Sequence, residues 1–299
     1  MNEFILLNKN NKKINIIEGI HINKIKTIIV HIHGMGSHFQ PYYQCIDEFK
    51  DKDLLFSNFN YKSFALEFHG HGKSEGNRCS INSFDDLLDD LDLLINYIKI
   101  KYDQPIFLMA ESMGCAVALK YCIIKNNNIK IKNNNIKGII LCAPLFGIDD
   151  KLRPNYLVTL ILTIISYFIP EMPLLSNNLS SIAVKNDDFI KAKDNNKYSY
   201  KGNHKLNTCR EMVKISDWID NNGYLLETPI LVFHGLKDTI TNPLITKKIF
   251  DKMISKDKEL HLIKDGYHCL LIESEDNPYL PGYIIGKMIN WINERTFLN

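Results

Sequence analysis

The sequence predicts an α/β fold with a mostly parallel central sheet and helices on both faces. Two observations support this class. Short apolar, β-branched runs alternate with helical segments along most of the chain, as in the repeated strand–helix units that build a parallel sheet. The 299 residues, of which 45% are hydrophobic, are also enough to bury one large core plus an insertion.

The strand-like runs are short and bounded by turn residues. Residues 4–7 and 14–17 flank a polar Asn/Lys turn, a pattern typical of a hairpin at a sheet edge. Further strands are predicted at 27–33, 62–67, 105–109, 137–142, 229–235 and 260–264.

Helices are predicted between the strands, and one of them has a three-and-four spacing of apolar residues that marks a buried face. That helix covers 83–102, where Ser83 and Asp86 form a start that resembles a capping box. The others cover 244–254 and 284–296.

A serine lies in a predicted strand-to-helix turn. Ala110, Ser112 and Gly114 match the G-x-S-x-G nucleophile elbow, except that alanine replaces the first glycine. The flanking residues must be small because the turn brings backbone against backbone and leaves the serine hydroxyl exposed. The alternative is a serine that only caps a helix.

A serine nucleophile needs a base and a carboxylate that orients the base. Asp238 follows the predicted strand 229–235, and His268 follows the predicted strand 260–264. Residues after parallel strands gather at one edge of the sheet, where ligands bind. The chain order Ser112, Asp238, His268 is the order found in α/β-hydrolases. Taken singly, Asp238 is also compatible with a turn and His268 with a surface loop.

A glycine-rich loop follows the predicted strand 27–33. Gly34 and Gly36 remove side-chain obstruction, so a backbone N–H can approach a developing oxyanion. The backbone N–H groups of Met35 and Met113 are the predicted oxyanion-hole donors. A glycine-rich turn without a catalytic part is the alternative.

Together these residues resemble the monoacylglycerol lipase and lysophospholipase branch of the α/β-hydrolases. The chain departs from the branch at two residues. Ala110 replaces the first glycine of the elbow, and Glu67 stands where the family usually has aspartate. Neither residue is a member of the triad. The resemblance implies an α/β-hydrolase fold, a serine ester hydrolase and an inserted helical cap. The matching stretches are 33–38, 70–76, 111–114, 143–145, 234–238 and 266–268.

The cap is expected at residues 146–227, between two parts of the core at 1–145 and 228–299. No strand is predicted in this segment, which breaks the alternation. Residues 157–169 are strongly apolar. They predict either a helix buried against the core or an exposed face that guides an acyl chain from a membrane or micelle into the site.

Composition excludes several other functions. The net charge of +2 and pI near 8.0 create no strong field, so no nucleic-acid partner is expected. Seven scattered cysteines without a C-x-x-C pair favour reduced thiols. The N-terminus lacks the pattern of a signal peptide. We therefore expect a cytoplasmic protein, peripheral at membranes through its cap, that needs neither cofactor nor metal.

The predicted function is cleavage of carboxylic esters of monoacyl lipids, monoacylglycerol or lysophospholipid, through a Ser-His-Asp triad and an acyl-enzyme. Small soluble or xenobiotic esters are an alternative substrate class, and a non-catalytic receptor with this fold is an alternative function. A metal-dependent hydrolase built on His31 and His33 is disfavoured because no H-x-H-x-D-H motif continues from them. The sequence sets neither the exact ester nor the oligomeric state.

Overall fold

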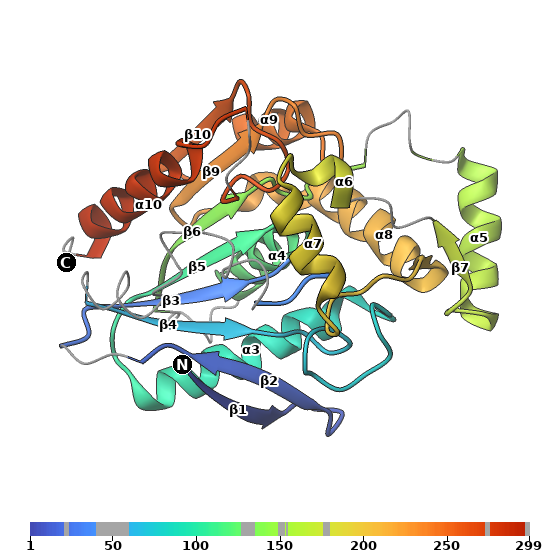
Figure 1. The fold of residues 1–299 in the computed structure, drawn as a ribbon, viewed down its shortest axis with the longest axis horizontal. Helices are drawn as coiled ribbons and strands as arrows, with labels where there is room; N and C mark the ends of the chain where they lie inside the picture. The colour runs from blue at the N-terminus through green and yellow to red at the C-terminus, as the bar shows by residue number, and fades with distance from the viewer. Residues whose placement is uncertain are drawn as a thin grey trace.

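The computed structural model describes residues 1–20, 24–39, 60–126, 135–148, 153, 155–175, 180–272 and 276–296. Within them, an eight-stranded sheet has the order β1-β2-β4-β3-β5-β6-β9-β10 (Figure 1). Neighbours from β4 to β10 are parallel, whereas β1–β2 and β2–β4 are antiparallel. The strands are β1 Asn2–Leu7, β2 Lys13–Glu18, β3 Thr27–Ile32, β4 Tyr61–Leu66, β5 Ile106–Glu111, β6 Ile136–Cys142, β9 Ile230–Gly235 and β10 Lys258–Ile263.

Strands β1 and β2 form the predicted edge hairpin. Phe4 pairs with Ile16 and Leu6 with Ile14. Because β2 also pairs with β4, the hairpin extends the parallel part of the sheet at one edge.

Two apolar cores lie on opposite faces of the sheet, and β5 contributes to both. Its side chains alternate, so Ile106 and Leu108 pack on one face while Phe107 and Met109 pack on the other. The first core includes side chains of α3 Phe84–Lys101, α4 Met113–Asn126, α8 Leu206–Asn222 and α9 Pro243–Lys252, and the second includes α10 Leu280–Thr296 (Figure 1). The predicted α/β class, with helices on both faces, is confirmed.

The predicted helices are confirmed to within a few residues of their ends. Helix α3 begins after Ser83, whose side chain accepts a hydrogen bond from the Asp85 N–H. Its predicted apolar face is buried. Helices α9 and α10 correspond to the predicted segments 244–254 and 284–296.

The segment between β6 and β9 is mainly helical, but it contains two short strands. Strands β7 Pro173–Leu175 and β8 His204–Lys205 pair antiparallel. The prediction of no strand within 146–227 is therefore wrong at these residues, because pairings of two or three residues leave no alternation to detect. The other described elements there are α5 Tyr156–Phe168, α6 Ser180–Ala183, α7 Asp187–Asn195, α8 and the 3₁₀ turn Gly223–Leu225.

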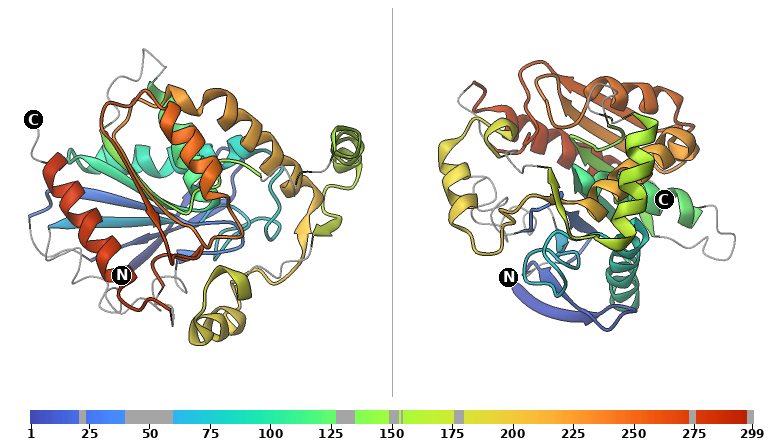
Figure 2. Two further views of the ribbon diagram at one scale, coloured as in Figure 1. Left: turned by 90° about the horizontal axis from the view of Figure 1, so that it is seen from above. Right: turned by 90° about the vertical axis from the view of Figure 1, so that its right-hand side faces the viewer.

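Helix α5 exposes most of its apolar side chains. Tyr156 is 82% exposed and Phe168 is 81% exposed, and Ser166 is the buried residue of the helix. Ser166 accepts a hydrogen bond from Arg210 of α8, whose guanidinium also lies over the Tyr167 ring. Figure 2 shows α5 at the opposite end of the molecule from α10. Of the two alternatives for this segment, the structure has the exposed apolar face.

No helix in the described part of the chain is both long and apolar enough to cross a membrane.

Candidate functional site

Ser112 occupies a strained turn between β5 and α4. Its φ is +52°, in the left-handed region that residues other than glycine rarely adopt. Hydrogen bonds hold the turn on both sides, since the Ser112 N–H donates to the Cys142 carbonyl at 3.0 Å and the Leu145 N–H donates to the Ser112 carbonyl at 3.1 Å. A strained residue persists only when its surroundings enforce it, and here the end of β6 does so.

The elbow needs glycine at position 114 because α4 starts against the end of β3. A Cβ on Gly114 would lie 2.6 Å from the Ile32 carbonyl oxygen and 2.7 Å from the His33 carbonyl oxygen. The extra methyl at Ala110 is accommodated in the core. The sequence therefore departs from the elbow pattern at the position that tolerates a side chain.

Asp238 and His268 follow neighbouring parallel strands and are in direct contact. Asp238 lies three residues beyond the end of β9, and His268 lies five residues beyond the end of β10. The Asp238 Oδ2 atom is 2.7 Å from His268 Nδ1, and both side chains are buried. Ser112 follows β5 in the same sheet, so all three residues come from the carboxyl ends of parallel strands.

A network of donors keeps the Asp238 carboxylate ionised. The backbone N–H groups of Ile240 and Thr241 donate to Oδ1, and the Thr241 hydroxyl donates to Oδ2 at 2.7 Å. The His234 ring lies 3.2 Å from Oδ2. Burial alone would raise the pKa of Asp238, but the hydrogen bonds from His234, His268 and Thr241 outweigh it and hold the pKa far below its usual range.

The pKa of His268 is raised above its ordinary value of 6.5. Burial acts in the opposite direction, but the hydrogen bond and negative charge of Asp238 outweigh it, with a further contribution from Glu111. Nδ1 is the ring nitrogen in contact with Asp238, so Nε2 is the nitrogen that the carboxylate does not engage. Among the described residues, no hydrogen bond joins His268 to Ser112. The structure therefore pairs the predicted base with its carboxylate but not with the serine.

The loop after β3 brings Gly34 against the elbow. A Cβ on Gly34 would lie 3.0 Å from the Ser112 Cβ. The amide N–H groups of Met35 and Met113 belong to the two segments that meet here, the loop after β3 and the first turn of α4. The predicted oxyanion-hole segments are thus adjacent.

His33 fixes the orientation of the Gly34–Met35 peptide. The Phe68 N–H donates to His33 Nε2 at 3.1 Å, so that nitrogen is the acceptor and Nδ1 carries the proton. Nδ1 then donates to the Gly34 carbonyl at 2.7 Å. In a trans peptide the carbonyl and the N–H point in opposite directions, so the Met35 N–H is turned away from the ring. Burial lowers the pKa of His33 to about 4, which keeps the ring neutral.

These contacts disfavour the alternative of a metal site at His31 and His33. Both ring nitrogens of His33 are already hydrogen-bonded, so the ring has no lone pair to offer a metal. His31 lies instead against the Phe39 ring. The described residues contain no group of three or more His, Cys, Asp or Glu side chains that could hold a metal ion.

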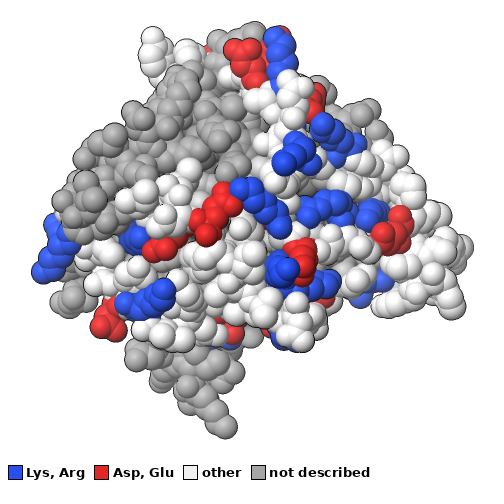
Figure 3. All heavy atoms as spheres, turned by 60° about the horizontal axis from the view of Figure 1, so that its bottom comes forward, with Lys and Arg blue, Asp and Glu red and all other residues white. Residues whose placement is uncertain are grey.

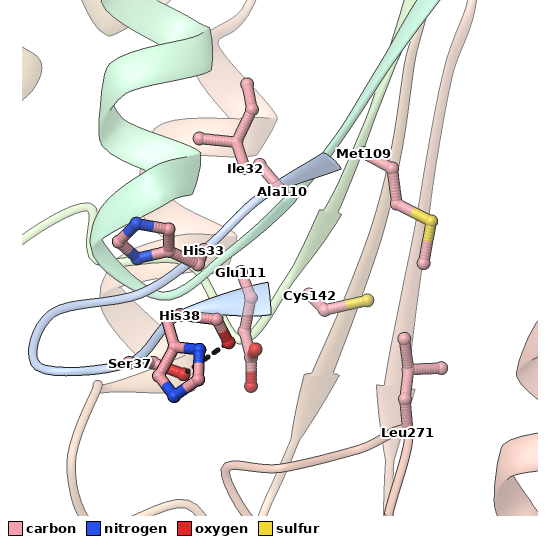
Figure 4. A pocket seen from close by; sticks show the side chains of 9 residues that line it. All are labelled: Ile32, His33, Ser37, His38, Met109, Ala110, Glu111, Cys142 and Leu271. Atoms are coloured by element: carbon pink, nitrogen blue, oxygen red, sulfur yellow. Dashed lines mark hydrogen bonds between the residues drawn. The ribbon is translucent and has the colours of Figure 1, made fainter. Parts of the chain in front are cut away.

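A small recess, partly open to solvent, lies beside the elbow. Figure 4 shows its polar side chains, with Glu111 near the loop that carries Ser37 and His38. The other lining residues are Ile32, His33, Met109, Ala110, Cys142 and Leu271. The recess therefore combines a carboxylate and imidazoles with an apolar wall.

Several residues of the site were not predicted from the sequence. Thr241 and His234 support Asp238, whereas His33 bonds the Gly34 carbonyl through Nδ1 and the Phe68 N–H through Nε2. The D-x-x-T spacing of Asp238 and Thr241 is a local signal, because an aspartate often accepts hydrogen bonds from the residues that follow it in a turn. The contact between His33 and Phe68 joins the segments that follow β3 and β4, which are far apart in the chain, and leaves no signal in the sequence.

Comparison with known proteins agrees with the fold. A family model described as serine aminopeptidase, S33, matches residues 23–275. Caffeoylshikimate esterase of Arabidopsis thaliana is 26% identical over 91% of this chain and 79% of its own length. A putative monoglyceride lipase of Schizosaccharomyces pombe is 25% identical over 90% of this chain and 68% of its own length.

A solved structure supports the same fold. The soluble variant of monoglyceride lipase from Saccharomyces cerevisiae, in complex with a substrate analogue, superposes with a TM-score of 0.78. The alignment covers 100% of this chain and 96% of that chain at 19% identity, which establishes similarity of fold. The predicted α/β-hydrolase fold is confirmed, and the family match spans most of the chain. The chain belongs to the serine aminopeptidase S33 family, a serine hydrolase family of the α/β-hydrolase fold.

Proposed function

We propose that this protein is a carboxylic ester hydrolase in which Ser112 is the nucleophile, His268 the general base and Asp238 its orienting carboxylate. The observation that carries the proposal is the buried Asp238–His268 contact of 2.7 Å at the sheet edge where the strained Ser112 turn lies. A carboxylate paired with an imidazole beside a serine elbow is the arrangement that activates a serine hydroxyl.

The reaction follows from these roles. The Ser112 Oγ attacks the ester carbonyl carbon while His268 Nε2 takes the hydroxyl proton. The N–H groups of Met35 and Met113 stabilise the negative oxygen that develops. The bond to the alcohol breaks, and His268 returns the proton to the departing alcohol oxygen. Water then attacks the acyl carbon, its proton passes through His268 to Ser112 Oγ, and the carboxylic acid leaves.

The favoured substrates are esters of monoacyl lipids, either monoacylglycerol or lysophospholipid. Two findings support this class: the relatives named monoglyceride lipase, and the exposed apolar face of α5. We infer that residues 146–227 form a cap over the core parts 1–145 and 228–299, and that α5 contacts a membrane or micelle surface peripherally. On the face in Figure 3, basic side chains lie among acidic ones, which gives no uniform field for nucleic acid.

Small soluble esters are the second candidate class. The similarity to a caffeoylshikimate esterase favours it, because that relative is named for an ester of an aromatic acid. The two classes differ in their dependence on acyl chain length. Each acyl methylene buried in an apolar tunnel contributes about 0.8 kcal/mol, so a lipid esterase should prefer long chains strongly.

The decisive experiment combines a fluorophosphonate probe with a panel of esters. The probe should label the wild-type protein at Ser112, and the panel should vary chain length and headgroup independently. Labelling with turnover that increases with chain length supports a lipid esterase, whereas labelling without turnover of any ester would indicate a receptor. Absence of labelling at Ser112 would rule out the proposed nucleophile.

The pH dependence of turnover should report the raised pKa of His268. As the pH falls through this pKa, kcat/KM should fall, because a protonated imidazole cannot accept the serine proton. Since Asp238 raises the pKa above 6.5, the midpoint of the acid limb should lie above pH 6.5 for a short soluble ester. Asp238→Asn should move the midpoint downward. A wild-type midpoint at or below 6.5 would contradict this assignment.

Charge on the exposed face of α5 should impair hydrolysis of lipid more than hydrolysis of a soluble ester. Ile161 and Ile164 are about half exposed, so Ile161→Glu and Ile164→Glu should fold normally. Burying such a side chain in an apolar phase contributes about 1.5–3 kcal/mol, so we expect at least a tenfold loss on long-chain monoacylglycerol in micelles. A short soluble ester should be hydrolysed at nearly the wild-type rate.

Ile100→Glu is the matched control for these variants, because Ile100 is an exposed isoleucine on α3. This variant should hydrolyse both substrates normally. Equal losses on both substrates in Ile161→Glu would mean that α5 has no role in delivering lipid.

A further inference from the structure

A buried histidine outside the Asp238–His268 pair connects the loop after β3 to the segment after α7. His38 is 1% exposed, and its two ring nitrogens face different elements. Nδ1 lies 3.3 Å from Glu67 Oε1, just beyond β4. Nε2 lies 3.2 Å from Asn196 Oδ1, at the end of α7. We call Glu67, His38 and Asn196 the His38 bridge.

Both partners of the ring are hydrogen-bond acceptors. The Tyr198 N–H donates to Asn196 Oδ1 at 2.8 Å, which identifies that atom as the amide oxygen. The other oxygen of Glu67, Oε2, accepts from the Asn15 amide at 2.9 Å and from the Lys73 N–H at 2.7 Å. Burial would raise the pKa of Glu67, but these hydrogen bonds and the one from His38 lower it, so the carboxylate is ionised.

A neutral imidazole has one N–H and can therefore satisfy only one of these two acceptors. Only an imidazolium donates from both nitrogens. We propose that His38 is held as a buried imidazolium, and that it acts as a positioning residue which fastens the loop carrying Met35 to the segment after α7.

The surrounding charges favour an imidazolium. Glu67 is in contact, and Glu111 of β5 lines the same recess as His38. His33, on the same loop, is neutral because burial lowers its pKa to about 4. Two cations lie near the Tyr198 ring. The Lys73 ammonium is bonded to Glu3 and lies 5.8 Å from the ring centroid, and the Lys197 ammonium lies 4.8 Å from it. The Tyr198 ring itself meets the His38 ring edge-on at 6.0 Å.

The bridge acts on the loop that lies against Ser112. The Tyr200 N–H donates to the Gly36 carbonyl at 3.2 Å, so the loop and the segment after α7 share a second hydrogen bond close to the bridge. If Nε2 lost its proton, its lone pair would face a lone pair of Asn196 Oδ1, and this contact would no longer be a hydrogen bond. The Tyr200–Gly36 hydrogen bond would then hold the two segments together without the bridge. The consequence for catalysis rests on the proposed function, because it depends on Met35 acting as an oxyanion donor.

The first test measures the protonation state directly. In protein labelled with ¹⁵N-histidine, both ring nitrogens of His38 should give shifts of the protonated type at neutral pH, with the signals assigned through His38→Gln. A neutral tautomer of His38 at neutral pH would overturn the proposal.

The second test measures the coupling to the segment after α7. Asn196→Ala should lower the protection of the Tyr200 amide against hydrogen exchange by about tenfold, the typical effect of losing a hydrogen bond to a charged group. Asn196→Asp keeps an acceptor oxygen and should retain protection. Asn195→Ala, the neighbouring exposed asparagine, is the matched control and should leave protection unchanged.

Equal protection in Asn196→Ala and Asn195→Ala would overturn the proposal. Neither test requires turnover, so both can be carried out on Ser112→Ala protein. Failure of the ester hydrolase assignment and failure of the bridge are therefore distinguishable.

Discussion

Ser112→Ala is expected to lower ester turnover by about a million-fold while leaving the fold intact, as removal of the nucleophile does in other serine hydrolases. The loss is large because no other group can form the acyl-enzyme once Oγ is absent. The fold should survive because the side chain is small and the strained turn is held by backbone hydrogen bonds to Cys142 and Leu145. The measurement is kcat on a short soluble ester, together with a thermal unfolding curve.

The matched control addresses the alternative that Ser112 merely caps a helix. Ser83 caps α3, so Ser83→Ala removes a serine of that kind. This variant should lose about 1 kcal/mol of stability and retain turnover. Wild-type turnover in Ser112→Ala would show that the nucleophile lies elsewhere.

The fold was predictable because its signals are local. Each central strand is an apolar run bounded by turn residues, and the apolar spacing of α3 identifies its buried face. The elbow was predictable for the same reason, since Ser112 and its small neighbours are adjacent in the chain. The contact between Asp238 and His268 could be expected from topology, because both residues follow parallel strands that turn out to be neighbours. Their catalytic roles remain predictions.

The remaining features of the site depend on contacts between distant segments. The tautomer of His33 is set by the Phe68 N–H, and the His38 bridge joins residues that are far apart in the sequence. The exposure of α5 could not be predicted for the same reason, because its apolar composition fits a buried helix and an exposed helix equally well. Its exposure depends on how it packs against α8, where Ser166 meets Arg210.

His268→Ala is expected to be nearly as damaging as Ser112→Ala, on the order of a million-fold in turnover. Without the imidazole, Ser112 keeps its proton and Asp238 has no base to orient. His261→Gln is the control, because it removes a partly buried histidine from β10, the strand that leads to His268. The control should lose little activity on the same ester.

The double variant Ser112→Ala/His268→Ala gives the sharper result. If the base acts only through the serine, it contributes nothing once Oγ is gone, so the double variant should be little worse than either single one. Two independent contributions would instead multiply their losses. The residual rate, measured against the uncatalysed hydrolysis of the same ester, then reports what substrate binding and the N–H groups of Met35 and Met113 supply alone. Multiplied losses would mean that His268 acts on the substrate by a route that bypasses Ser112, and the pairing of base with nucleophile would fail.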